Sequence, residues 1–185
     1  MTNTFFCLAC VNTQTIAVVQ QCGNYSTLLH PGAQFIMCPL QNVAGTMSLR
    51  IQQLDVICET KTKDNVFVQV AVAVQYRVLP EKIYDAFYKL TDPTDQIRSY
   101  VYDVIRSAVP RLELDAAFAS KADIANACQD QLQKVMNEYG YEIMECLVTD
   151  LSPDQGVKAS MNEINASKRL KMASMHKADA DKIRQ

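Results

Sequence analysis

Strict alternation of apolar and polar positions predicts a long β-hairpin within residues 54–78. In its second half the even-numbered residues are apolar, whereas the odd-numbered residues are mostly polar or small. The apolar set is Val68, Val70, Val72, Val74, Tyr76 and Val78. A period of two with β-branched residues on one side is typical of a strand that packs one face against a core. The polar residues 59–65 are expected to form the turn.

The phase of this alternation changes just before the hairpin. Apolar residues occupy odd positions from Met47 to Ile51 and even positions from Leu54 to Cys58. A slip of one residue moves every side chain of a strand to the opposite face. We therefore predict a β-bulge at Gln52 and Gln53.

The rest of the chain predicts an α+β fold with an antiparallel or mixed sheet and packed helices. A first hairpin joins residues 15–21 to residues 25–29 through a turn at Gly23 and Asn24. The apolar run of residues 141–151, bounded by Ser152 and Pro153, predicts a strand in the interior of the sheet rather than at its edge. Beyond Pro153 the sequence predicts one long helix.

Helical periodicity predicts three helices between the strands. The first follows Pro80, the second begins at Asp92 and Pro93, and the third begins at Ser120 in a near capping box with Asp123. Pro110 is expected to end the second helix and Gly140 the third. The residues expected to point inward are Ile83, Phe87, Leu90, Ile97, Val101, Val104, Ile105, Ala108, Ile124, Cys128, Leu132, Val135 and Tyr139.

Composition narrows the class of protein. The 185 residues are 49% hydrophobic and 21% charged, without an apolar run long enough to span a bilayer and without the basic start of a secretory signal. Seven scattered cysteines predict reduced thiols. Residues 157–185 hold seven Lys or Arg against three Asp or Glu, so this segment carries +4 and the rest carries −6. Its acidic residues are interspersed and it holds no aromatic residue, which argues against nucleic-acid binding.

Catalytic and metal-binding motifs are missing from the sequence. We find no G-x-S-x-G, H-E-x-x-H or P-loop motif and no nucleophile paired with a base, so we expect neither an enzyme nor a cofactor. Cys7 and Cys10 form a single C-x-x-C, but zinc needs four ligands and only His30 and His176 could join them. A redox pair would open a helix, which this sequence does not predict. Cys58 is adjacent to Glu59, which would raise the pKa of its thiol.

The N-terminal residues 1–12 predict a membrane-proximal segment. Apolar Phe5, Phe6 and Leu8 surround Cys7 and Cys10. S-acylation of either cysteine, with the neighbouring apolar side chains entering the headgroup region, would attach the chain to membrane lipid. The alternative is that both cysteines are packed inside the fold.

Blocks distributed along the chain resemble the band 7, or stomatin/prohibitin/flotillin (SPFH), superfamily, and within it the hypersensitive-induced response proteins. They are LRIQQLDVICETKTKDNVFV at residues 49–68, DAFYKL at 85–90, YVYDVIRSAVP at 100–110, YGYEI at 139–143 and MNEINA at 161–166. The resemblance implies a band 7 domain over residues 13–152. It also implies that residues 153–185 begin a longer coiled-coil helix that drives ring or cage assembly and continues past Gln185.

The start of the chain departs from the pattern of the resembled plant proteins. Those proteins open with Met-Gly-Asn and a cysteine pair, whereas this chain opens with Met1, Thr2 and Asn3 and matches only Cys7 of the pair. Without glycine after Met1, N-myristoylation is excluded. Membrane attachment is therefore expected to depend on Cys7, Cys10, the apolar neighbours and the avidity of an oligomer.

The terminal helix gives a weak coiled-coil pattern. Lys168 and Lys171 occupy positions where a heptad needs apolar residues. The candidate oligomerisation residues are Val157, Met161, Ile164, Leu170, Met172 and Met175. The alternative is that this apolar face packs on its own domain.

The functional prediction is a non-enzymatic homo-oligomeric scaffold on the cytosolic face of a membrane. The resemblance implies the plasma membrane, palmitoylation, raft-like microdomains, an unidentified membrane-protein client and a role in defence or cell-death signalling. One alternative is a soluble intracellular adaptor that binds its client through the strand face carrying Phe67, Gln75 and Arg77. Another is a prohibitin-like or stomatin-like regulator of a membrane protease or channel.

Overall fold

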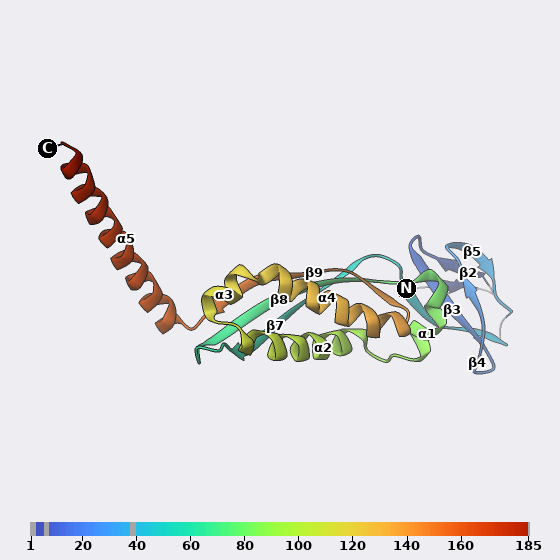
Figure 1. Cartoon of the computed structure of the whole chain (residues 1–185). Helices are drawn as coiled ribbons and strands as arrows, with labels where there is room; N and C mark the ends of the chain where they lie inside the picture. The colour runs from blue at the N-terminus through green and yellow to red at the C-terminus, as the bar shows by residue number, and fades with distance from the viewer. Residues whose placement is uncertain (1–2, 6–7, 38–39, 185) are drawn as a thin grey trace.

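The computed structural model describes residues 3–5, 8–37 and 40–184, and the side chains of residues 8–37, 40–164 and 166–176. It confirms the α+β class. Figure 1 shows an elongated molecule with small N-terminal sheets at one end, a helix-covered sheet in the middle and a long helix that projects from the other end.

The N-terminal end consists of two three-stranded antiparallel sheets. One has the strand order β1-β2-β5 and the other β4-β3-β6. Their strands are β1 (Asn3–Phe5), β2 (Leu8–Val11), β3 (Thr15–Gln21), β4 (Asn24–Leu29), β5 (Gly32–Phe35) and β6 (Gln41–Ser48). A small separate core fills the space between them: Ala9, Val11, Ala17, Val19, Leu29 and Ile36. The predicted first hairpin is confirmed as β3 and β4, but its turn lies at Cys22 and Gly23, both at positive φ, and not at the predicted Gly23 and Asn24.

The predicted long hairpin is β7 (Gln52–Lys61) and β8 (Phe67–Val78), which pair antiparallel along their whole length. The even-numbered apolar residues of β8 are buried, as expected. β9 (Tyr141–Pro153) completes the sheet in the order β7-β8-β9. This prediction of β9 as an interior strand is wrong, because β9 lies at an edge. Two bulges in its pairing with β8 expose Met144 and Leu147, which explains why the sequence looks apolar on both sides.

The predicted bulge at Gln52 and Gln53 is also wrong. The register of β7 against β8 runs without a break from Gln52 opposite Tyr76 to Lys61 opposite Phe67. β6 ends at Ser48 and belongs to a different sheet. The change of phase therefore marks the gap between β6 and β7. These strands belong to different sheets, so their alternation does not have to keep one phase.

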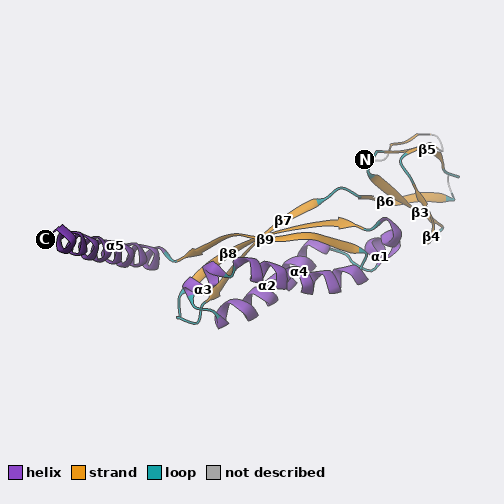
Figure 2. Ribbon diagram, turned by 45° about the horizontal axis from the view of Figure 1, so that its top comes forward, coloured by secondary structure: helices purple, strands orange, loops and turns teal. Residues whose placement is uncertain are grey.

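Helices cover one face of the large sheet, as Figure 2 shows. The covering helices are α1 (Ile83–Tyr88), α2 (Pro93–Ala108), α3 (Leu114–Ala119) and α4 (Lys121–Glu138), with 3-10 turns at Pro80–Lys82 and Val109–Arg111. The last helix, α5 (Gln155–Arg184), projects away from the sheet (Figure 1). Ile97, Ile105 and Leu132 are fully buried between α2, α4 and the sheet. Val135 and Tyr139, expected to point inward, are half-buried, and the buried residue in that turn is Met136.

The predicted start of α2 is confirmed. Asp92 Oδ1 accepts hydrogen bonds from the backbone N–H of Thr94 at 2.9 Å and of Asp95 at 3.4 Å. These bonds favour the ionised carboxyl and lower the pKa of Asp92.

The predicted capping box at the start of α4 is wrong. Ser120 makes no side-chain capping bond, because it also ends α3, a helix that the sequence reasoning missed, and so lacks the extended backbone of a normal N-cap. α3 is fixed to the tip of the β7–β8 hairpin. There Asp64 Oδ2 accepts a hydrogen bond from the backbone N–H of Leu114 at 2.9 Å.

Aromatic side chains join the N-terminal sheets to α1. The ring centroids of Tyr25 on β4 and Tyr84 on α1 are 5.0 Å apart, and Gln20 Nε2 donates a hydrogen bond to Tyr88 Oη at 2.8 Å. Phe87 packs so closely on Gly45 that a Cβ there would lie 2.8 Å from its ring. These contacts hold the N-terminal end on the rest of the molecule.

Gly140→Ala should destabilise the fold more than Gly23→Ala does. Both glycines have positive φ, but a Cβ at Gly140 would lie 2.6 Å from Lys82 O, whereas a Cβ at Gly23 would meet no atom within 4 Å. We expect Gly23→Ala to cost about 1 kcal/mol of unfolding free energy and Gly140→Ala at least about 2 kcal/mol, measured by urea denaturation. Equal losses would show that the approach of Lys82 to Gly140 adds no cost.

Candidate functional site

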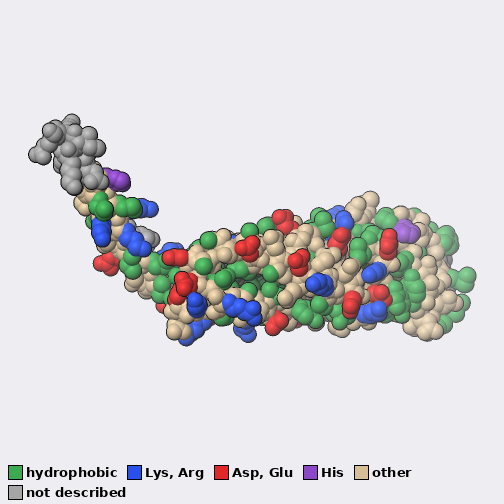
Figure 3. Space-filling model, in the orientation of Figure 1, with side chains coloured by type: hydrophobic (Ala, Val, Ile, Leu, Met, Phe, Trp, Pro, Cys, Tyr) green, Lys and Arg blue, Asp and Glu red, His purple; other side chains and the backbone are tan. Residues whose placement is uncertain are grey.

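The N-terminal end carries no Lys, Arg, Asp or Glu. The first charged residue of the chain is Arg50, so β1 to β6 contain uncharged residue types, with His30 as their single histidine. On the face seen in Figure 3, charged side chains lie over the rest of the molecule, whereas this end shows hydrophobic and uncharged ones. An uncharged surface can approach an apolar phase without the large desolvation cost that a charge would impose.

Exposed apolar side chains gather at this end. Pairing of β2 with β5 places Leu8 opposite Phe35 and Cys10 opposite Ala33, so these residues share one outward face. Phe35 is 80% exposed, and Met37 and Leu40, which follow it, are 66% and 50% exposed. β2 and β5 lie at the end of the molecule opposite α5 (Figure 1). We call Leu8, Phe35, Met37 and Leu40 the apolar tip.

The structure describes only some of the predicted anchor residues. Leu8 and Cys10 are exposed, whereas Ala9 and Val11 alternate with them into the small core. Phe5 lies in β1, but its side chain is not described, and Phe6 and Cys7 lie outside the described residues.

Sequence reasoning missed Phe35, Met37 and Leu40. The signal that could have found them is the unbroken absence of charged residues before Arg50.

The predicted oligomerisation residues fall into two groups. Val157 and Met161, near the start of α5, pack against the main core of their own domain. The other four are more than half exposed: Ile164, Leu170, Met172 and Met175. The structure thus supports packing on its own domain for the first turns of α5 and leaves the later apolar side chains largely exposed.

The strand face named for the adaptor alternative is also exposed. Phe67 is 58% exposed, and the Lys61 ammonium lies 5.7 Å from the centroid of its ring. Arg77 Nε donates a hydrogen bond to Glu142 Oε2 at 2.7 Å, which joins β8 to β9. Gln75 lies between these ends on the same face of β8.

The pKa values of the three buried thiols are shifted in different directions: those of Cys58 and Cys128 are raised, whereas a hydrogen bond with Cys128 lowers that of Cys146. Burial raises the pKa of Cys58, and the nearby Arg106 guanidinium offsets this only in part. A hydrogen bond with Cys146, together with burial, raises the pKa of Cys128. No group of three or more His, Cys, Asp or Glu that could hold a metal ion occurs among the residues that the structure describes.

Comparison with known proteins decides the family. Residues 9–182 match the SPFH domain / Band 7 family. The chain belongs to this family. This band 7 chain is 46% identical over 188 residues to hypersensitive-induced response protein 4 of Arabidopsis thaliana, an alignment that covers 100% of the chain and 64% of the plant protein. The resemblance inferred from the sequence blocks is therefore confirmed.

More distant relatives are similar over most of the band 7 chain. It is 24% identical to human mitochondrial stomatin-like protein 2 over 89% of its own length and 46% of that protein. It is 25% identical to an uncharacterized protein of Methanocaldococcus jannaschii, over 93% of its own length and 85% of the archaeal protein. The chain thus spans less than two thirds of the plant and human relatives. Among the described residues, no helix has the length and apolar character needed to cross a bilayer.

Timed alkylation should separate the cysteines of the folded band 7 chain. Cys10 and Cys22 are exposed and should react with iodoacetamide, whereas Cys58, Cys128 and Cys146 are buried and should react only after denaturation. Mass spectrometry of peptides taken at successive times measures each site. Equal labelling of Cys10 and Cys128 would contradict the outward position of Cys10 on β2.

Proposed function

We propose that this band 7 chain is a non-enzymatic scaffold that attaches to the cytosolic face of a membrane and assembles with copies of itself. Residues 1–12 and the apolar tip contact lipid, residues 13–152 form the band 7 domain, and residues 153–185 contribute to assembly. Such an assembly would gather lipids and membrane proteins into a microdomain. The similarity to hypersensitive-induced response protein 4 favours the plasma membrane and a defence-related client.

The observation that carries this proposal is an uncharged end with an exposed apolar tip. Fully burying one large apolar side chain contributes about 1.5–3 kcal/mol, so insertion of Phe35, Met37 and Leu40 gives several kcal/mol for each copy. A gain of this size supports weak, reversible attachment of a single copy. Assembly of several copies with their tips on one side would multiply it.

S-acylation would strengthen the same attachment. Cys10 is exposed beside Leu8, so a palmitoyl group on its sulfur would extend from the face that carries the apolar tip. Pairing of β2 with β5 holds this cysteine on the folded domain. An acyl chain at Cys10 would therefore draw the tip toward the bilayer.

A second candidate function is that of an adaptor for a client protein. The exposed ring of Phe67 favours it, because large aromatic side chains are common anchors of protein interfaces. Similarity to stomatin-like protein 2 is compatible with a regulator of a membrane protease or channel, which would use the same scaffold with a different client.

Phe35→Ser combined with Met37→Ser should weaken binding to neutral phosphatidylcholine vesicles. Each lost side chain removes about 1.5 kcal/mol or more of the free energy of burial, so the partition coefficient should fall at least about a hundredfold. Vesicle flotation of the full chain at low and high salt measures it. Because the tip is uncharged, its contribution should not depend on salt.

The matched control for the tip variant is Phe118→Ser combined with Met144→Ser. These side chains are 37% and 39% exposed and lie on α3 and β9, away from the N-terminal sheets. The control should bind vesicles as the unaltered chain does. Equal binding by both double variants would overturn the apolar tip as the lipid contact.

Hydroxylamine, which cleaves thioesters, should release part of the protein from membranes of cells that express it. Replacing Cys7 and Cys10 together with Phe5 and Phe6 by Ser should shift the protein to the soluble fraction, since it removes the acylation sites and apolar neighbours. Cys22→Ser, at the exposed turn between β3 and β4, is the control. Unchanged membrane association of the fourfold variant would contradict an N-terminal anchor.

A further inference from the structure

The large sheet has one face that no part of the described chain covers with helices. α2 and α4 pack on the other face (Figure 2), toward which the even-numbered residues of β8 point. The odd-numbered residues of β8 and their cross-strand partners form the uncovered face, which we call the open sheet face. It comprises Gln53, Asp55, Ile57, Glu59, Lys61, Phe67, Gln69, Ala71, Ala73, Gln75, Arg77, Glu142, Glu145, Leu147, Asp150 and Ser152.

The centre of the open sheet face carries small apolar side chains. Ala71 lies opposite Ile57, and Ala73 lies opposite Leu147. The two alanines of the central strand are small, whereas Ile57 on β7 is 67% exposed and Leu147 on β9 is 42% exposed. We call this row of small side chains on β8, between larger ones on β7 and β9, the trough.

The rim of this trough is acidic. Asp55 and Glu59 on β7 and Glu145 and Asp150 on β9 stand on both sides of it. With the Arg77–Glu142 pair and Lys61 included, the open sheet face holds five carboxylates and two cations, a net charge of −3.

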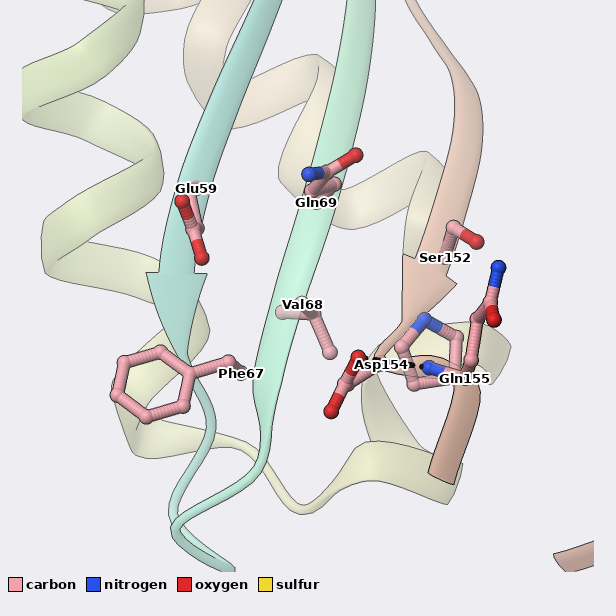
Figure 4. A pocket seen from close by; sticks show the side chains of 8 residues that line it. Glu59, Phe67, Val68, Gln69, Ser152, Asp154 and Gln155 are labelled. Carbon is pink, nitrogen blue, oxygen red and sulfur yellow. Dashed lines mark hydrogen bonds between the residues drawn. The ribbon is translucent and has the colours of Figure 1, made fainter. Parts of the chain in front are cut away.

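The trough ends in a hollow of about 590 Å³ near the start of α5. Figure 4 shows Glu59, Gln69 and Ser152 in a row across the three strands, with Phe67 and Asp154 beyond them. The lining of this hollow includes both apolar and acidic side chains, as the trough does.

α5 has complementary properties. Its residues 157–176 hold four Lys or Arg and one Glu, a net charge of +3. Ile164, Leu170, Met172 and Met175 are exposed on the same helix.

The helix does not lie on the open sheet face of its own copy. α5 leaves the end of β9 and projects away from the sheet (Figure 1), and its contacts with its own core are made by Val157 and Met161 at its start. We propose that the open sheet face binds α5 of a second copy of this chain. The contact is heterologous, because a sheet face of one copy meets a helix of another, and repetition of it builds a ring or a filament.

This inference rests on the self-assembly in the proposed function and names its two surfaces. The charge of the open sheet face selects a basic partner, and α5 supplies both the basic and the apolar side chains that the trough requires. A basic helix of a client protein is the competing occupant. If a client helix is the occupant, the purified chain should not self-associate.

Two charge-reversed variants of the full chain test the proposal. The face variant carries Glu59→Lys, Glu145→Lys and Asp150→Lys, and the helix variant carries Lys168→Glu, Arg169→Glu and Lys171→Glu. In each variant alone the two surfaces have the same sign of charge, so the dissociation constant of self-association should rise at least about tenfold. In an equimolar mixture each open sheet face meets an oppositely charged α5, so assembly should return.

The control has the same change of net charge on the helix-covered side of the molecule. Asp103→Lys, Asp130→Lys and Glu138→Lys replace exposed residues of α2 and α4 and should leave assembly unchanged. Sedimentation velocity over a range of concentrations measures each sample, and vesicle flotation of the same samples measures membrane attachment separately.

The outcomes separate this inference from the proposed function. Assembly of both reversed variants alone would overturn the inference and leave the scaffold standing on other surfaces. Loss of assembly that the mixture does not restore would also overturn it, because the open sheet face and α5 would not be partners. An unaltered chain that stays monomeric at every concentration would overturn both the inference and the self-assembly of the proposed function.

Discussion

The rest of the structure depends on the one-sided burial of β8. Its even-numbered residues from Val68 to Val78 are buried beneath α2 and α4, and its backbone bonds to β7 on one side and β9 on the other. Apolar burial fixes the register, because a slip of one residue would turn this row toward solvent. The same constraint leaves the opposite face of the sheet without helices. The open sheet face is thus a consequence of how the core is made.

Charge is divided among three parts of the chain. The part before Arg50 has no charged residue, residues 50–156 carry −6 and residues 157–185 carry +4. The uncharged part can approach lipid without desolvating an ion, whereas under the proposal the acidic sheet of one copy would attract the basic helix of another. Membrane attachment would then use one end of an elongated molecule, and self-assembly would use its middle and its other end (Figure 1). One copy could therefore bind a membrane and another copy at the same time.

The outcome of most structural predictions follows from the range of the interactions behind them; the local capping box at Ser120 is the exception. The β7–β8 hairpin, the α2 cap at Asp92 and the end of α4 near Gly140 depend on neighbours in sequence, and all three are confirmed. The bulge at Gln52 and the interior position of β9 were wrong, because they depend on which strands share a sheet. α3 was missed because its start depends on Asp64 at the distant hairpin tip. The apolar tip was missed because Leu8 and Phe35 become neighbours only through strand pairing.

The sequence by itself determined the α+β class, the band 7 membership, the faces of β8 and the division of charge, because local periodicity, motif order and composition carry that information. It also indicated Leu8, Cys10 and the apolar residues of α5 as candidates. Only the tertiary structure decided that Leu8 and Phe35 share a surface, that Val157 and Met161 pack on their own domain and that one sheet face stays open. These facts depend on contacts between residues far apart in the chain, which no local pattern records.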